Sequence, residues 1–304
     1  MYMENTAKNF ALQLGSLISL SISIVALITL LSGVITLQYP DVANGYWEQE
    51  SASSSIRFSI AMLFVFFPTY IALTRMVNTI RRVEQGVYLA LTKWLIYLSL
   101  LIGGGAILGD LVSVINAFLN GELTVRFILK ALVFLFVIGS AFVYYVLDVR
   151  GYWQHNEKGS LRYAGVISLS VIISLCIGYL NIEAPTQVRE MKIDAQQIND
   201  LSNIQSHIES YVYLNAKLPE SIDVAFNGIA IPEATEERNA YIYTITKKDT
   251  YTLCAEFAFE SVVGVGQFSE PIFYEDGMQK NVYTWEHGAG DWCFERVVDI
   301  HPEK

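Results

Sequence analysis

Three charged residues lie within or beside long apolar stretches of this sequence, where a charge is costly and is often functional. Asp110 lies inside the apolar stretch Leu95–Leu119, Arg57 directly precedes Phe58, and Lys130 follows Phe127 closely. At ~1.5 Å per residue, Asp110 lies about 22 Å along a helix that begins at Leu95. The three side chains can therefore share one depth in a helical bundle.

Such a cluster admits a structural and a functional interpretation. In the structural one, which we prefer, Asp110 forms a buried ion pair with Lys130 or Arg57 and fixes the packing of the helices. In the functional one, Asp110 carries an ion or proton relay. A third reading leaves the Asp110 carboxylate in interfacial water.

The elements that position these residues are five long apolar stretches. A helix needs ~20 mainly apolar residues to cross the hydrocarbon core of a bilayer, with ~17 as a practical minimum. The second stretch, Phe58–Leu73, reaches this length only if Ile56 and Arg57 are included, with the Arg57 guanidinium extending toward the interface. The stretches are Phe10–Leu37, Phe58–Leu73, Leu95–Leu119, Phe127–Leu147 and Tyr163–Leu180.

Positive residues gather in alternate gaps between these stretches, and they mark the cytoplasmic side of a membrane protein. Residues 38–56 contain no Lys or Arg, and the gap after the third stretch contains Arg126 alone. The distribution predicts a plasma-membrane protein with a cytoplasmic N-terminus and an extracytoplasmic segment 183–304. A cleaved signal peptide is the rival reading of Phe10–Leu37, which is longer than a signal core of ~7–15 residues. The basic gaps hold Arg75, Arg81, Arg82 and Lys93, and then Arg150, Lys158 and Arg162.

The charge balance changes at the end of the fifth stretch. Residues 1–182 carry 11 Lys and Arg against 9 Asp and Glu (11 − 9 = +2), and residues 183–304 carry 9 against 21 (9 − 21 = −12). The acidic segment repels nucleic acid and anionic lipid headgroups, so we expect no nucleic-acid partner. We read it as a solvated surface beside the bilayer.

Several motifs between Phe67 and Arg150 resemble a known family. They are Phe67-Pro68-Thr69-Tyr70, Lys93-Trp94-Leu95-Ile96-Tyr97-Leu98, Gly109-Asp110-Leu111, the run from Asn120 to Lys130, and Tyr144-Tyr145-Val146-Leu147-Asp148-Val149-Arg150. This part of the chain resembles the bacterial membrane family called domain of unknown function 5671, a four-helix module, over about residues 9–150. The resemblance implies a fold and a topology, and it implies no catalytic residue.

The pattern changes in the segment 183–304. From Val188 to Tyr211, apolar residues recur at steps of three and four, which predicts an amphipathic helix with Asp194 off its apolar stripe. Period-two alternation in Tyr241–Lys247 and Tyr251–Phe259 then predicts a β-hairpin around Lys248-Asp249. Trp292–Ile300 is expected to be a third strand.

A long helix followed by a small antiparallel sheet is similar to the globular part of type II secretion major pseudopilins. The likeness rests on the helix segment Asp200–Gln205, on Lys217-Leu218-Pro219, and on Tyr241 and Tyr251 within the hairpin. No Gly-Phe-Thr-type prepilin peptidase site precedes the fifth apolar stretch. The resemblance therefore implies only the fold, and it carries no filament-forming role.

Two of the three cysteines are expected to pair. Cys254 and Cys293 fall in different predicted strands of a domain outside the cytoplasm, where disulfides persist. The alternation places each on the more polar face of its strand, so we favour a disulfide over two free thiols. Cys176 lies inside the fifth apolar stretch and reads as a small apolar-facing residue.

The sequence offers no catalytic constellation. The four histidines are scattered, and neither a phosphate-binding loop nor a nucleophile motif is present. We therefore expect no enzymatic activity, no cofactor and no metal.

The sequence as a whole predicts an all-α membrane bundle of five transmembrane helices followed by an extracytoplasmic α+β head. The domains are a four-helix module at 1–150, a cytoplasmic loop and fifth helix at 151–182, and the head at 183–304. The expected function is to present a non-enzymatic head to an extracytoplasmic protein partner or to a second copy of the chain. A small-solute or ion transporter that uses the Asp110 cluster is the alternative.

Overall fold

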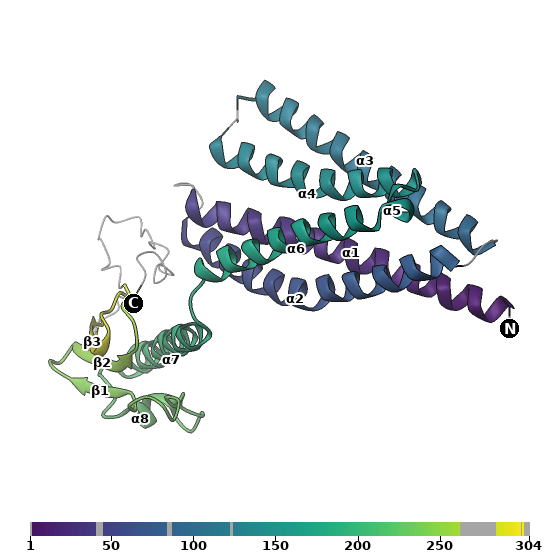
Figure 1. The fold of residues 1–304 in the computed structure, drawn as a ribbon. Helices are drawn as coiled ribbons and strands as arrows, with labels where there is room; N and C mark the ends of the chain where they lie inside the picture. Colours follow the sequence, from purple (N-terminus) through teal and green to yellow (C-terminus); the bar gives the residue numbers. More distant parts are fainter. Residues whose placement is uncertain are drawn as a thin grey trace. The chain divides into compact units, whose positions relative to one another are not determined.

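The computed structural model of the protein describes residues 2–40, 45–83, 87–121, 124–261, 284–298 and 300. The chain divides into two units, Met1–Ile182 and Glu183–Lys304, each with its own hydrophobic core (Figure 1). The first unit is helical, and the second combines helices with a small sheet.

Within the described part of the chain, five helices are long and apolar enough to cross a membrane, which agrees with the predicted number and indicates a membrane location. The long helices of the first unit are α1 (Tyr2–Gln38), α2 (Gly45–Val83), α3 (Val87–Leu119), α4 (Val125–Val149) and α6 (Glu157–Leu180), and a short helix, α5 (Tyr152–His155), precedes α6. Figure 1 shows α3 and α4 side by side, and α1 packs against α2, α3, α4 and α6.

Helix α2 extends well beyond the apolar stretch Phe58–Leu73 at both ends. It contains 39 residues and includes Pro68 in its interior. At 1.5 Å per residue it is about 58 Å long, whereas the hydrocarbon core is about 30 Å thick. Its polar ends can therefore lie outside the hydrocarbon, and the shortness of the apolar stretch is no obstacle to crossing.

The core of the first unit forms where α1 meets α2 and α6. Leu30 of α1 and Ile56 of α2 are fully buried. At Gly33 of α1, an added Cβ would lie 2.7 Å from Ile56 Cγ1, so only a hydrogen fits there. At Gly178 of α6, an added Cβ would lie 3.2 Å from three carbons of Leu30. These two glycines allow α2 and α6 to pack closely on α1.

The glycines of α3 do not have this role to the same degree. An added Cβ at Gly103 or Gly104 would be in ordinary contact with the Phe142 ring of α4, at 3.6 and 3.5 Å. At Gly105 and Gly109 it would meet nothing within 4 Å. The closest glycine contacts of the first unit are therefore those of α1 and α6.

The second unit contains the predicted helix and a three-stranded antiparallel sheet in the order β1-β2-β3. The third strand differs from the predicted Trp292–Ile300, because it begins earlier and ends at Val297. The described elements of the second unit are α7 (Pro185–Asn215), α8 (Ile222–Phe226), β1 (Ile242–Ile245), β2 (Thr250–Phe257) and β3 (Gly290–Val297).

One face of the sheet and one stripe of α7 form the core of the second unit. Tyr251, Leu253, Ala255 and Phe257 alternate along β2 and are all buried, as the period-two pattern predicts. The α7 stripe that belongs to the same core contains Leu201, Ile204, Ile208 and Val212. Burial of these side chains is the main stabilising contribution to the unit.

Asp194 of α7 is buried, although the amphipathic pattern places it off the apolar stripe. Its carboxylate accepts hydrogen bonds from the backbone N–H groups of Ala258 and Phe259 at 3.0 Å, just after β2 ends. It also accepts a hydrogen bond from Arg238 Nη2 at 3.3 Å. A buried carboxylate is tolerated here because strong donors surround it.

Arg238 connects Asp194 to a second carboxylate, that of Glu190 one turn earlier on α7. Burial disfavours the charged guanidinium, but hydrogen bonds to Glu190 and Asp194 outweigh this effect and raise the pKa of Arg238. The group stays positively charged at every physiological pH. It ties the loop before β1 to the first half of α7.

Gly33→Ala is expected to destabilise the first unit, and Gly105→Ala is the matched control. Both replacements improve helix propensity by about 1 kcal/mol, because glycine is the weaker helix former. At Gly33 the new methyl group overlaps Ile56, which costs about 1–3 kcal/mol. Thermal unfolding of the full chain in detergent should show a lower midpoint for Gly33→Ala and an unchanged or higher one for Gly105→Ala. Equal midpoints would contradict the close α1–α2 contact.

Asp194→Asn is expected to destabilise the second unit by about 3 kcal/mol, because Arg238 and two backbone donors lose a charged acceptor. The control is Asp291→Asn, at an exposed aspartate of β3. Pulse proteolysis of the full chain in urea measures the unfolding of this unit. The midpoint should fall for Asp194→Asn and stay within error for Asp291→Asn. A wild-type midpoint in the first variant would show that the buried carboxylate contributes little.

Candidate functional site

The three charged residues predicted to form a cluster lie on different helices: Arg57 on α2, Asp110 on α3 and Lys130 on α4. Arg57 pairs within its own helix, with 3.8 Å between its Nη1 and Glu50 Oε1. In the described part of the chain, no ion pair joins Asp110 to Lys130 or to Arg57. For Arg57 the reason is geometric, since α3 packs on α4 and α1, whereas Arg57 lies on α2. Asp110 and Lys130 lie on neighbouring helices but form no ion pair with each other.

The ion pair that does join two long helices is Glu48–Arg126. Arg126 Nη1 donates to Glu48 Oε2 at 3.0 Å, and Nη2 donates to Oε1, so the interaction is bidentate. The pair links the first turns of α2 and α4, and Lys130 interacts electrostatically with both residues. The signal for this pair in the sequence is a pair of opposite charges, each just before an apolar stretch.

A cavity with a volume of about 380 Å³ lies at the other end of the first unit, between α2, α4 and α6. Helix α2 contributes two adjacent rows of side chains. Phe67, Ile71 and Arg75 form one row, and Tyr70, Thr74 and Asn78 form the other. Residues four positions apart lie on one helix face, so this spacing directs both rows toward α6.

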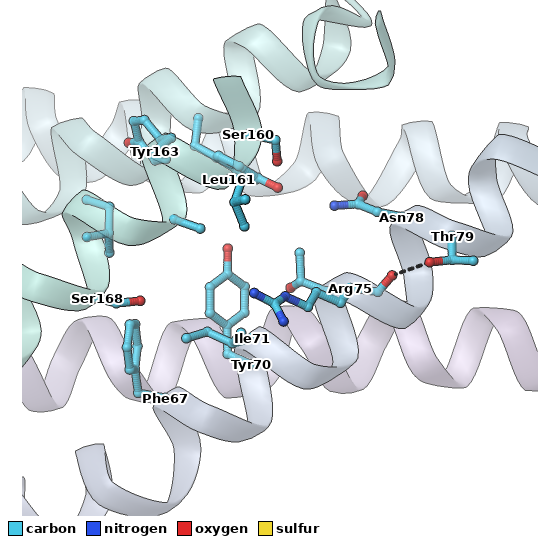
Figure 2. Close-up of a pocket in the computed structure, with 14 residues that line it drawn as sticks. Phe67, Tyr70, Ile71, Arg75, Asn78, Thr79, Ser160, Leu161, Tyr163 and Ser168 are labelled. Carbon is cyan, nitrogen blue, oxygen red and sulfur yellow. Dashed lines mark hydrogen bonds between the residues drawn. The ribbon is translucent and has the colours of Figure 1, made fainter. Parts of the chain in front are cut away.

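The lining changes from apolar to polar along the cavity. Phe67 and Ile71 of α2 and Ile167 of α6 lie toward the middle of their helices, whereas Arg75 and Asn78 lie near the end of α2. Figure 2 shows the Tyr70 hydroxyl and the Arg75 guanidinium in the space between the two helices. Ser160, in the first turn of α6, faces this space from the other side.

Hydrogen bonds and ring contacts fix the walls of the cavity. The Tyr163 hydroxyl donates to the Ser140 carbonyl of α4 at 2.6 Å, and Thr74 shares a 2.7 Å hydrogen bond with Ser16 of α1. Aromatic side chains of α4, α5 and α6 gather at this end of the unit. The Trp153 ring stacks on the Tyr144 ring with 5.3 Å between ring centroids, and Trp153 Nε1 donates to the Tyr144 carbonyl at 3.0 Å.

Arg75 is the charged residue of the cavity lining. In the part of the chain that the structure describes, no ion pair involves its guanidinium, and the Thr79 hydroxyl donates to its backbone carbonyl. No hydrogen bond from the Asn78 amide or the Ser160 hydroxyl to another described residue is present. These groups are therefore positioned to bind an anion.

In the second unit, Cys254 and Cys293 form a disulfide. They are direct partners in the β2–β3 register, on the sheet face that points away from the core. Cys176, on α6, is a free and exposed thiol.

His287 is buried against the core of the second unit, where its ring stacks on Phe257 with 3.7 Å between ring centroids. Burial lowers the pKa of His287. Its backbone N–H donates to Ser261 Oγ, and its carbonyl accepts from the Ser261 N–H, both at 2.9 Å. The contacts are structural, as expected for this residue.

Elsewhere in the second unit, desolvation and the hydrogen bond to Asp200 raise the pKa of Tyr241, and burial raises that of Tyr243 to about 12. Both phenols therefore stay neutral. Among the described residues, no group of three or more His, Cys, Asp or Glu side chains is placed to hold a metal ion. Gly264, Gly266 and His301 lie outside the described residues.

Residues 9–145 match the family model described as "Domain of unknown function (DUF5671)". The chain therefore contains a domain of this family, as the motifs between Phe67 and Arg150 predict. No curated protein and no solved structure matches the chain. The pseudopilin resemblance of the second unit thus has no support from these comparisons.

The disulfide predicts a defined thiol count for the full chain. Alkylation after denaturation without reduction should modify Cys176 alone, and prior reduction should expose all three cysteines. The bridge closes a 40-residue loop (293 − 254 + 1), and the chain-entropy model assigns such a loop about 4 kcal/mol.

Cys254→Ser with Cys293→Ser should therefore lower the urea midpoint of the second unit, while Cys176→Ser leaves it unchanged. Mass spectrometry counts the modified thiols in protein that matured in an oxidising compartment. Three modified cysteines without reduction would refute the bridge.

Proposed function

We propose that the protein is a multi-pass plasma-membrane protein that holds its second unit outside the cytoplasm, where this unit binds a protein partner without catalysing a reaction. The observation that carries the proposal is a disulfide in the unit that follows the last long helix of the first unit, α6. Disulfides persist in oxidising compartments and are rare in the cytoplasm.

The distribution of Lys and Arg supports the same orientation. Arg75 near the end of α2, Lys93 near the start of α3, and Arg150 and Lys158 between α4 and α6 all belong to one end of the first unit. At the other end the cations are fewer: Arg126 and Arg57, each paired with a glutamate, and Lys130. Positive residues concentrate on the cytoplasmic side, so the start of α7 belongs to the opposite side.

A binding role for the second unit is supported by its surface. Tyr213 and Leu214, at the end of α7, are 74% and 79% exposed, and they are the most exposed large apolar side chains described in this acidic unit. Exposed apolar groups rimmed by polar residues are typical of interaction sites. A partner protein with a basic rim, or a second copy of this chain, fits such a surface.

The transport alternative receives no comparable support. It depends on a charge cluster around Asp110, whereas the interhelical ion pair of the described residues is formed by Glu48 and Arg126. We therefore keep the interaction role as the proposal.

Single cysteines on a Cys176→Ser background test the orientation, because the disulfide leaves no other reactive thiol. Glu220→Cys lies at an exposed position of the second unit, and Lys158→Cys lies at an exposed position of α6. A membrane-impermeant maleimide should label Glu220→Cys in intact spheroplasts and Lys158→Cys only after lysis. The reverse pattern would overturn the orientation and the role built on it.

A further inference from the structure

We propose that the cavity between α2, α4 and α6 binds the phosphate headgroup of an anionic membrane lipid, with Arg75 as its cationic anchor. Basic pockets between transmembrane helices are typical headgroup sites. The proposal assigns a ligand class to a part of the protein that the interaction role of the second unit does not use.

The position of the cavity matches the depth of a headgroup. Arg75 lies close to Ile80, where the candidate membrane span of α2 ends, and Ser160 lies in the first turn of α6. Both residues therefore lie at one end of the bundle, where headgroups meet the hydrocarbon. The site faces the leaflet in which α2 ends, whichever orientation the protein has.

The polar end of the cavity has the donors that a phosphate group requires. A guanidinium binds two phosphate oxygens at once, and it is more weakly hydrated than an ammonium group. The Asn78 amide and the Ser160 hydroxyl can donate to the remaining oxygens from opposite walls (Figure 2). No carboxylate belongs to the cavity lining, although the buried Asp148 interacts electrostatically with Tyr70 of the lining.

The apolar end favours a lipid over a free phosphate ion. Phe67 and Ile71 of α2 and Ile167 of α6 continue the cavity away from Arg75. A soluble phosphate would leave these side chains without a partner, whereas the first methylene groups of an acyl chain would cover them. A volume of about 380 Å³ holds a headgroup with the start of its chains, and it lies within the usual size range of ligand pockets.

Alternative uses of the cavity are less consistent with its lining. Tyr163 and Thr74 are already engaged in hydrogen bonds to neighbouring helices. Of the remaining donors, Asn78 and Ser160 lie at the Arg75 end of the cavity, and Ser168 lies near Phe67 at the other end (Figure 2). The lining thus favours an amphiphile that is held at one end.

Lipid titrations of the purified full chain in detergent, followed by native mass spectrometry, test the proposal. The probes are dioleoyl-phosphatidylglycerol, dioleoyl-phosphatidylcholine and inorganic phosphate. The anionic lipid should bind wild-type protein about tenfold more tightly than the zwitterionic lipid, and Arg75→Gln should weaken it by about five- to tenfold. Lys93→Gln, at an exposed basic residue of α3, should bind like wild type.

A second variant separates the cavity from general surface charge. Ile71→Trp keeps Arg75 and fills the apolar end, so it should also weaken the anionic lipid, while the thermal midpoint of each variant shows that it is folded. Unchanged binding in Arg75→Gln, or equal losses in Arg75→Gln and Lys93→Gln, would overturn the site. Displacement of the lipid by millimolar inorganic phosphate would overturn the choice of a lipid as the ligand.

Discussion

Hydrocarbon offers no hydrogen-bond partner to a backbone N–H or C=O group, so a chain that crosses it must satisfy these groups within its own helices. The first unit follows this constraint with five long helices. Polar side chains within them obey it too. Ser23 donates to the Ser19 carbonyl at 2.7 Å, and Thr69 donates to the Val65 carbonyl at 2.7 Å. Because such bonds are local, the helices can carry many hydroxyl groups without an interhelical partner.

Helix association in the same environment depends on contact rather than on exclusion of water. Two glycines provide this contact. Gly33 of α1 lets Ile56 of α2 approach closely, and Gly178 of α6 does the same for Leu30 of α1. The helices pack closely around Gly33 and Gly178. Around Tyr144 and Tyr163, a space lies between α2 and α6. The cavity that contains Arg75 is thus a consequence of how the helices pack, with Tyr144 and Tyr163 holding its far wall.

The second unit is stabilised by different interactions. Its sheet has three strands, and one face of it is covered by α7. Two additional links complement this small core. Asp194 joins α7 to the end of β2, and the Cys254–Cys293 disulfide joins β2 to β3 on the opposite face. Small domains commonly need such links, because their cores alone contribute little net stability.

Helix number, the amphipathic α7, the hairpin and the shared strand face of Cys254 and Cys293 could be predicted from the sequence, because each depends on a local period or length. The partners of charged residues could not be predicted in this way. Asp110 and Lys130 looked like a pair from their depth, yet Arg126 meets Glu48, because rotation of each helix about its axis decides which side chains face each other. Burial of Asp194 likewise depended on backbone donors at Ala258, far along the chain. Local patterns of residues therefore predict which segments become helices and strands. The ion pairs and the cavity depend on the tertiary structure, since they require distances between elements that no local pattern contains.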